Sequence, residues 1–240
     1  MTFLNILENG ITYHYNERKR KDRNGNIYSI KSYTSTHNIP TQFKVFFNIA
    51  IFGGLRKGEI LALTWNDIDF QNNTISIHKS VCYTKGQIII KKPKTQKSNR
   101  TITLPSSVIN IINIYYKEWE QLKETLGPDW KGSDYLFIQS DGSLMHPSTP
   151  YHKFKEIIHQ YNATCQKESD KLPLITLHDL RHTSATLLIS QNIDIAVVSE
   201  RLGHSNISTT LDIYTHALKK ADESASNKLE NIFFPKINAE

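Results

Sequence analysis

Two short stretches near the C-terminus carry side chains that could bind and attack a phosphate. In His178-Asp179-Leu180-Arg181-His182, the first histidine and the arginine would share a helix face, because residues three apart are neighbours there. In Leu202-Gly203-His204, the histidine follows a glycine helix stop, and Tyr214 comes ten residues later. Cations, imidazoles and a phenol suit a phosphate better than a metal or an apolar ligand. Taken singly, the last histidine is typical of a helix cap, and the tyrosine of a half-buried core residue.

A zinc site is the competing interpretation of the first stretch. A zinc-protease signature needs a glutamate that reaches the metal-bound water, and this sequence has the shorter Asp179 in that place. Arg181, inside the same stretch, would also repel a metal cation. A third interpretation makes His178 or His182 a structural histidine satisfied by hydrogen bonds. The residues alone leave all three interpretations open.

Two cationic features lie upstream. Arg56 follows Gly53-Gly54-Leu55 at an expected helix start, where unpaired N–H groups favour anions and a guanidinium can grip two phosphate oxygens. The alternative is a surface arginine paired with Glu59 of the same helix. Residues 85–100 form the second feature, and they contain no carboxylate. Such a basic hairpin either follows the phosphates of a groove or protects a sheet edge with lysine. Its cations are Lys85, Lys91, Lys92, Lys94, Lys97 and Arg100.

The elements that would position these residues are mainly helices. Periodicity and helix stops predict a mainly helical α+β domain with a small three-stranded antiparallel sheet on one side. The three strands are expected at residues 74–79, 87–92 and 100–104. The helices are expected at residues 40–54, 55–65, 106–126, 147–167, 177–191, 195–202, 208–216 and 219–230.

Composition points to an intracellular protein with an anionic partner. The 29 Lys and Arg residues against 23 Asp and Glu give a net charge of +6, which mildly favours nucleic acid over an ordinary basic protein. Cys82 and Cys165 cannot form a disulfide framework and are expected as reduced thiols. There is no apolar run of 18 residues and no signal-peptide pattern, so we expect no membrane span and a cytoplasmic location.

Residues 1–38 differ from the rest of the chain. A basic run extends from Arg18 to Arg23, and Asn24-Gly25-Asn26 predicts a turn. We interpret this segment as a mobile or partly extended leader, or as the end of a missing upstream domain. It is either an arm that touches DNA or a solvated charged loop.

Four segments together resemble the catalytic domain of tyrosine recombinases, the phage integrase family. They occur in the family's order and spacing between Pro40 and Leu218. The nearest resemblance is to integrases of Gram-positive phages and conjugative transposons, which implies the tyrosine recombinase catalytic fold. The segments are GGLRKGEILALTWNDID, KKPKTQKSNRTITLP, LHDLRHTSATLL and LGHSNISTTLDIYTH.

The resemblance implies a role for each matching residue. Two arginines would clamp the scissile phosphate, two histidines would assist them, a lysine would protonate the leaving group, and the tyrosine would be the nucleophile. These catalytic positions are Arg56, Lys94, His178, Arg181, His204 and Tyr214, with Lys97 as the alternative lysine. The residues expected to contact DNA are Lys91, Lys92, Lys97 and Arg100.

The activity implied is site-specific DNA recombination through a 3′-phosphotyrosine, with no metal and no cofactor. The implied partners are double-stranded DNA, further copies of the chain in a tetrameric synapse of the full-length protein, and accessory DNA-bending or excision proteins. The resemblance implies that residues 1–38 are a leader or the remnant linker of a missing N-terminal DNA-binding domain. We expect a catalytic domain at 39–218 and a C-terminal helix and tail at 219–240, docked on a neighbouring protomer or on its own chain. The alternatives are a non-cleaving DNA-binding remnant and, more remotely, a zinc hydrolase using His178 and His182.

Overall fold

The computed structural model describes residues 2–91, 99–204, 206 and 211, which fall into two compact units. The first unit is drawn from Met1–Asn48, Ser107–Ser133 and Phe137–Leu177. The second is drawn from Ile49–Ser106, Asp134–Leu136 and His178–Glu240. Each unit is therefore assembled from segments far apart in the sequence.

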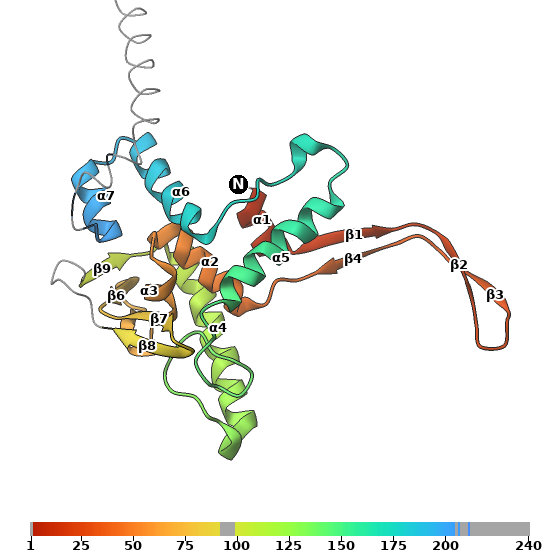
Figure 1. The fold of residues 1–240 in the computed structure, drawn as a ribbon, viewed down its shortest axis with the longest axis horizontal. Coiled ribbons are helices and arrows are strands. Elements are labelled where there is room, and N and C mark those ends of the chain that lie inside the picture. Colours follow the sequence, from red (N-terminus) through yellow and green to blue (C-terminus); the bar gives the residue numbers. More distant parts are fainter. Residues whose placement is uncertain (1, 92–98, 205, 207–210, 212–240) are drawn as a thin grey trace, which may run out of the picture. The chain divides into compact units, whose positions relative to one another are not determined.

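The first unit combines helices with a long antiparallel ribbon (Figure 1). Strand β1 pairs with β4 along their whole length, and β2 pairs with β3 beyond them. The sequence predicted a mobile or partly extended leader over residues 1–38, and within it the four strands are extended whereas residues 2–9 form a helix. The elements are α1 (Thr2–Asn9), β1 (Ile11–Tyr15), β2 (Arg18–Lys21), β3 (Ile27–Ile30), β4 (Tyr33–His37), the start of α2 (Thr41–Gly53), nearly all of α4 (Ser106–Leu126), the short 3-10 helices Gly127–Asp129 and Glu168–Asp170, and α5 (Thr149–Thr164).

Aromatic side chains form the centre of the first unit. Phe47 and Phe154 are fully buried, and Phe3 meets both edge-on, with ring centroids 5.6 and 5.1 Å away. Phe46 lies edge-on to Phe137 at 5.1 Å. Edge-to-face packing of this kind favours the positive ring edge against the negative ring face. Phe46 and Phe47 of α2 thus belong to the core of this unit.

The second unit holds the small sheets and the two helices that carry the histidines. Strands β5, β6 and β9 form a three-stranded antiparallel sheet, and β7 and β8 form a separate hairpin. The elements are the end of α2, α3 (Lys57–Leu61), the 3-10 helix Trp65–Asp67, β5 (Ile68–Asp69), β6 (Thr74–Ile77), β7 (Ser80–Thr84), β8 (Gln87–Lys91), β9 (Arg100–Thr103), α6 (Leu177–Ser190) and α7 (Ile195–Leu202).

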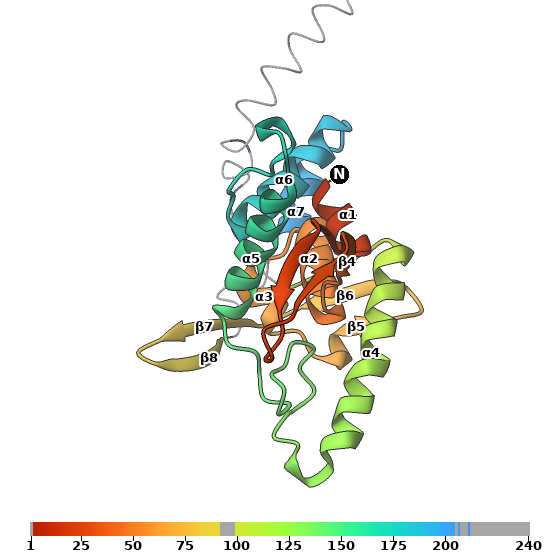
Figure 2. The ribbon, with the colours of Figure 1, turned by 90° about the vertical axis from the view of Figure 1, so that its right-hand side faces the viewer.

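The α+β prediction is confirmed, but the membership of the three-stranded sheet was predicted wrongly. The run at 87–92 was expected in that sheet, whereas β8 pairs with β7, a strand that the sequence analysis missed. The turn explains the difference. Lys85 and Gly86 both have positive φ, 49° and 78°, as a two-residue hairpin turn that matches strand twist requires. Figure 2 shows the hairpin standing apart, and the two-residue β5 takes the third place in the sheet.

Helix bounds follow the sequence closely where caps and stops are clear. The helices α4 and α7 have the predicted bounds, and α5 and α6 are slightly shorter than predicted. Helix α3 is much shorter than the predicted 55–65. The helices expected at 208–216 and 219–230 lie, apart from Leu211, outside the described residues. No described helix has both the length and the hydropathy needed to cross a bilayer.

We expect Phe154→Ala to lower the free energy of unfolding by about 3–5 kcal/mol, because it leaves a cavity among buried rings. Urea denaturation measures this loss. Ile114→Ala is the matched control, since Ile114 on α4 is 56% exposed. An unchanged urea midpoint for Phe154→Ala would contradict the aromatic core.

Candidate active site

Four of the residues predicted from the sequence lie in the second unit and act on one another electrostatically. Arg56 stands just before α3 with extended backbone, and His178 and Arg181 lie in the first turns of α6. His204 follows α7, which ends at Gly203 in the left-handed conformation. The charges of Arg56 and Arg181 both influence the pKa values of the two histidines. The structure therefore brings these four residues into one cationic cluster.

Glu59 is the carboxylate at the centre of the cluster. Its Oε1 accepts a hydrogen bond from Arg56 Nη1 at 2.9 Å, and its Oε2 accepts one from the Arg56 backbone N–H at 3.0 Å. Arg100 Nη2 donates to the same Oε2 at 2.8 Å. Burial alone would raise the pKa of Glu59. The hydrogen bond and charge of Arg100, followed by those of Arg56, lower the pKa by more than burial raises it, so the pKa lies below its usual value.

The ion pair with Glu59 uses only some of the hydrogen-bond donors of Arg56. The ion pair was the structural alternative for this arginine, and it is present. Arg56 is nevertheless 43% exposed, and its Nη2 donates only a long 3.3 Å hydrogen bond to the Gly203 carbonyl. An arginine steered by a carboxylate on one edge keeps donors on the other edge for a ligand. Arg56 can therefore keep its ion pair with Glu59 and bind an anion at the same time.

Arg181 is the most buried cation of the cluster, with 2% of its surface exposed. Its Nη1 donates to the Gly54 carbonyl at 2.7 Å, while its Nη2 is buried without a hydrogen-bond partner among the described atoms. Burial, followed by the charge of Arg56, lowers the pKa of Arg181 to about 9. An unpaired buried donor costs about 1–3 kcal/mol, and more when it is charged. Such a cost is recovered when an anion accepts that N–H.

Both candidate histidines are neutral near pH 7. Burial, followed by the charges of His182 and Arg181, lowers the pKa of His178. Burial, followed by the charges of Arg181 and Arg56, lowers the pKa of His204 to about 4. A neutral imidazole can accept a proton, and a bound anion would raise both pKa values by favouring the charged form.

Two glycines let the segments approach closely. Gly54 has φ +63°, and a Cβ there would lie 2.5 Å from Leu202 Cδ2. Gly203 has φ +67°, and a Cβ there would lie 2.7 Å from Arg100 Nη1. Positive φ and missing space both select glycine. The loop before α3 and the end of α7 are thus held against each other and against β9.

Arg100 was expected to contact DNA, and the structure gives it a structural place. Its side chain is 6% exposed, paired with Glu59, and its Nε donates to the Arg201 carbonyl at 2.8 Å. Arg201 in turn donates from Nη2 to the carbonyls of Phe52 and Thr103 at 2.8 and 2.9 Å. A DNA contact by Arg100 remains a prediction. No sequence signal singled out Arg201, whose Nη2 bonds to backbone carbonyls while its Nε is buried without a partner among the described atoms.

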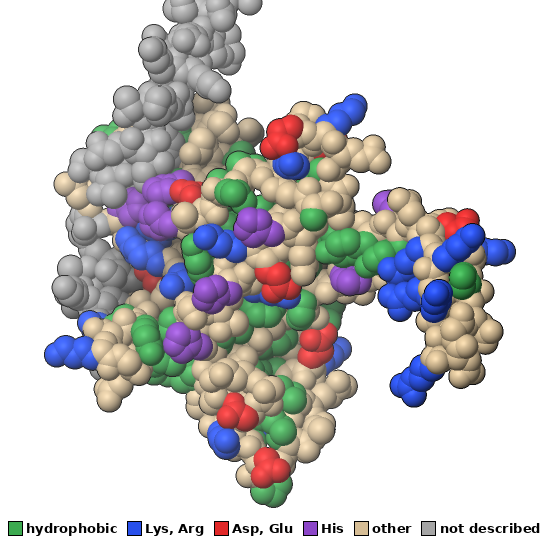
Figure 3. All heavy atoms as spheres, turned by 45° about the vertical axis from the view of Figure 1, so that its right-hand side comes forward, with side chains coloured by type: hydrophobic (Ala, Val, Ile, Leu, Met, Phe, Trp, Pro, Cys, Tyr) green, Lys and Arg blue, Asp and Glu red, His purple; other side chains and the backbone are tan. Residues whose placement is uncertain are grey.

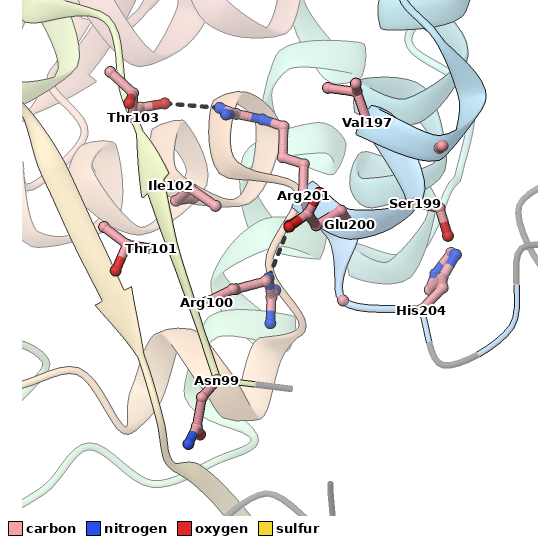
Figure 4. Close-up of a pocket in the computed structure, with 12 residues that line it drawn as sticks. Asn99, Arg100, Thr101, Ile102, Thr103, Val197, Ser199, Glu200, Arg201 and His204 are labelled. Carbon is pink, nitrogen blue, oxygen red and sulfur yellow. Dashed lines mark hydrogen bonds between the residues drawn. The ribbon is translucent and has the colours of Figure 1, made fainter. Parts of the chain in front are cut away.

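A cavity of about 630 Å³ lies between β9 and the end of α7 (Figure 4). Arg100, Arg201 and His204 are among its lining residues, whereas Arg56, His178 and Arg181 are not. The cavity therefore adjoins the cationic cluster and does not contain it.

The geometry around His178 and His182 gives little support to the zinc interpretation. His178 and His182 pack edge to face with ring centroids 4.4 Å apart, and His182 Nδ1 is buried without a partner among the described atoms. In the part of the chain that the structure describes, no three His, Cys, Asp or Glu side chains are grouped as metal ligands. The arginines next to His178 oppose a cation there.

Several predicted residues cannot be placed. Lys92, Lys94, Lys97 and Tyr214 lie outside the described residues. Lys91 ends β8 and is exposed. Glu59 is the main residue that the sequence analysis undervalued. Its position three residues after Arg56, at the start of a helix, was the available signal.

Known proteins match most of the chain. The phage integrase family matches residues 23–221. The ICEBs1 integrase of Bacillus subtilis (strain 168) is 34% identical over 190 residues, which cover 79% of this chain and 49% of that protein. The integrase of Staphylococcus phage L54a is 28% identical over 184 residues, 75% of this chain and 49% of the relative. The chain thus spans about half the length of these curated relatives.

Solved structures agree with these matches. The Tn1549 transposon integrase in complex with transposon right end DNA has a TM-score of 0.67 and 25% identity, and the match covers 80% of this chain and 60% of that one. The XerH recombinase bound to palindromic difH substrate has a TM-score of 0.55 and 27% identity, over 79% of this chain and 46% of that one. Since the family match extends over well more than half of the sequence, the chain belongs to the phage integrase family.

Proposed function

We propose that this chain is the strand-cleaving and rejoining part of a site-specific recombinase that moves a mobile element. The observation that carries the proposal is Arg181, a buried arginine with an unused N–H in a cluster with Arg56. Two guanidiniums from distant segments can hold the non-bridging oxygens of one phosphate. The relatives include integrases and transposases of mobile elements, and the Tn1549 integrase was solved with DNA.

The proposed reaction transfers a phosphoryl group without a metal. The Tyr214 oxygen attacks a DNA phosphorus, the bond to the 5′-oxygen breaks, and the tyrosine becomes linked to the 3′-phosphate. A 5′-hydroxyl of a partner strand then attacks this linkage, which rejoins DNA and regenerates the phenol. Arg56 and Arg181 stabilise the charge that builds on the phosphate oxygens.

The remaining groups handle protons and orientation. A phenol has an ordinary pKa near 10 and needs a base, and the neutral His178 can accept its proton. The leaving 5′-oxygen needs a proton, which Lys94, or Lys97 in its place, would supply. His204 donates a hydrogen bond to a phosphate oxygen and orients it. No cofactor enters this scheme, since the phosphotyrosine conserves the bond energy.

The partners follow from the reaction. Exchange between two duplexes requires double-stranded DNA and further copies of the chain, and we propose a tetrameric synapse for the full-length protein. Accessory DNA-bending or excision proteins would set the direction. Because the relatives come from bacteria, their phages and transposons, the DNA concerned lies in the cytoplasm.

We expect Tyr214→Phe to bind duplex DNA like the parent chain and to form no covalent adduct, because it lacks the attacking oxygen. A nicked suicide duplex, analysed on a denaturing gel, measures the adduct. A covalent adduct with Tyr214→Phe would show that another residue is the nucleophile. An unaltered parent chain that binds but forms no adduct would favour the non-cleaving alternative.

We expect Arg181→Lys to reduce the cleavage rate on saturating duplex by about 100-fold or more, because a point charge cannot replace two forked donors to the phosphate. Arg201→Lys is the matched control. It also replaces a partly buried guanidinium of the second unit, but one whose Nη2 donates to two backbone carbonyls, whereas Arg181 Nη2 has no partner among the described atoms. It should cleave at nearly the parent rate while folded. Equal rates for Arg181→Lys and the parent would refute the clamp.

We expect duplex DNA to raise the pKa of His204 from about 4, because phosphate charge favours the imidazolium form. An NMR titration of the histidine rings in the Tyr214→Phe background measures this shift, and His204→Gln identifies the resonance. A His204 pKa that stays the same at saturating duplex would place the phosphate away from this residue.

A further inference from the structure

A basic ribbon extends from the first unit and has no part in the active-site chemistry. We define it as residues 16–32, which include β2, β3 and their turn. All residues of β2 are exposed, as are nearly all of β3 (Figure 1). Figure 3 shows lysine and arginine side chains gathered on this projection. We therefore asked what a charged ribbon of this form could bind.

The ribbon holds most of the net charge of the chain. It carries six cations and two carboxylates, Glu17 and Asp22, so it contributes +4 of the total +6. In the described structure none of the six cations forms an ion pair with Asp or Glu. The cations are Arg18, Lys19, Arg20, Lys21, Arg23 and Lys31.

One of the two carboxylates is committed to the turn. Asp22 Oδ1 accepts hydrogen bonds from the backbone N–H groups of Asn24 and Asn26, at 2.8 and 2.9 Å. Its Oδ2 accepts one from Asn26 Nδ2 at 3.0 Å. These bonds, the one from the Asn26 side chain first, lower the pKa of Asp22. These bonds hold Asp22 in the turn, and its single negative charge offsets only one of the six cations.

Cations occupy both faces of the ribbon. Directly opposed residues of an antiparallel pair share a face, and successive residues alternate between faces. Arg20 stands opposite Tyr28 on one face, and Lys19 opposite Ser29 on the other. No carboxylate stands opposite any cation of β2. A strand that only protected an edge would need charge on one side, whereas a ribbon between two walls of phosphates needs it on both.

The base of the ribbon is built to hold it in place. Tyr15 and Tyr33 stack across β1 and β4 with ring centroids 4.7 Å apart and an interplanar angle of 15°. Tyr13 packs on His37 at 4.7 Å, and β1 packs on α5. By contrast, β2 and β3 form an isolated two-stranded pair whose like charges repel, which is marginal in water on its own. An anionic partner would remove that repulsion.

We propose that the basic ribbon binds double-stranded DNA, with its cations on phosphates along both walls of a groove. A two-stranded ribbon fits the major groove of B-form DNA, whose phosphate rows flank it on both sides. Neutral residues Ser29 and Tyr28, opposite Lys19 and Arg20, leave the strand free of competing carboxylates. This second DNA contact is separate from the catalytic residues and does not depend on Tyr214 as the nucleophile.

The test is the salt dependence of binding to a duplex of about 40 base pairs, measured by fluorescence anisotropy with the Tyr214→Phe chain. Each phosphate contact contributes about 0.9 to the slope of log affinity against log salt. The ribbon variant carries Arg18→Gln, Lys19→Gln, Arg20→Gln and Lys21→Gln. We expect its slope to fall by about 3 and its affinity near 0.1 M salt to fall at least tenfold.

The matched control removes four exposed lysines from the helical part of the same unit: Lys117→Gln, Lys123→Gln, Lys155→Gln and Lys167→Gln. Its slope should stay within about one of the parent, since few of these charges would meet phosphates. A ribbon variant whose slope equals that of the control would overturn the proposal and leave an acidic protein surface as the partner.

A second variant tests the ribbon without relying on single charges. Residues 16–32 are replaced by Asn-Gly, a two-residue hairpin turn that rejoins the paired Tyr15 and Tyr33. Because this variant lacks all six cations of the ribbon, we expect a loss of slope at least as large as that of the ribbon variant, with a thermal midpoint close to that of the parent. In the Tyr214 background, both variants should still form the covalent adduct at saturating duplex. If the phosphotyrosine proposal is wrong, no adduct forms, but the expected differences in slope between variants remain. The adduct and the slopes therefore test the two proposals independently.

Discussion

The buried carboxylate of Glu59 is the interaction on which the second unit depends. It receives the backbone and side chain of Arg56 and the side chain of Arg100, which comes from a strand 41 residues away. Burial opposes its ionisation, but the two arginines outweigh burial, so it remains charged. Removing one partner of such a buried pair costs about 3–5 kcal/mol, since the other charge is left unpaired. Glu59 thus stabilises the second unit and sets the orientation of the Arg56 side chain.

One carboxylate cannot balance the arginines around it. Arg56, Arg100 and Arg181 all lie within electrostatic reach of one another, and their mutual charges help to lower the pKa of Arg181 and His204. The free protein therefore holds an excess of positive charge in a partly buried region from which water is partly excluded. Stability alone would favour fewer cations there, whereas a transition state with extra negative charge on phosphate oxygens favours this arrangement. The excess of positive charge that burial disfavours in the free protein is the feature that we propose to stabilise a reacting phosphate.

Local signals in the sequence predicted much of the fold and of the site. The predicted bounds of 106–126 and 195–202 match α4 and α7, and α7 ends just before the glycine stop Gly203, because helix stops act within a few residues. The pairing of β7 with β8 was missed because Lys85, a residue type without a turn preference, adopts positive φ. The burial of Arg100 was missed because its partners, Glu59 and the Arg201 carbonyl, are far away in sequence. Residue types and spacing made Arg56, His178, Arg181, His204 and Tyr214 candidates for a phosphate site. The choice of that site over the structural and zinc alternatives, and the role of Lys94, rest on the family pattern.

The cations of this chain fall into two groups, one exposed to solvent and one buried, and salt affects the two groups differently. Those on β2 and its turn are exposed to solvent, so salt screens them, and they can act through counterion release from DNA. Arg181 and Arg100 are buried, so salt reaches them poorly, and their energy depends on hydrogen-bond geometry. Attraction to DNA and stabilisation of a reacting phosphate therefore need not use the same residues. Four of the six net charges lie on the exposed ribbon, whereas the buried arginines lie around Glu59. In the proposed scheme, DNA affinity and phosphate chemistry therefore use different cations, which differ in side-chain burial.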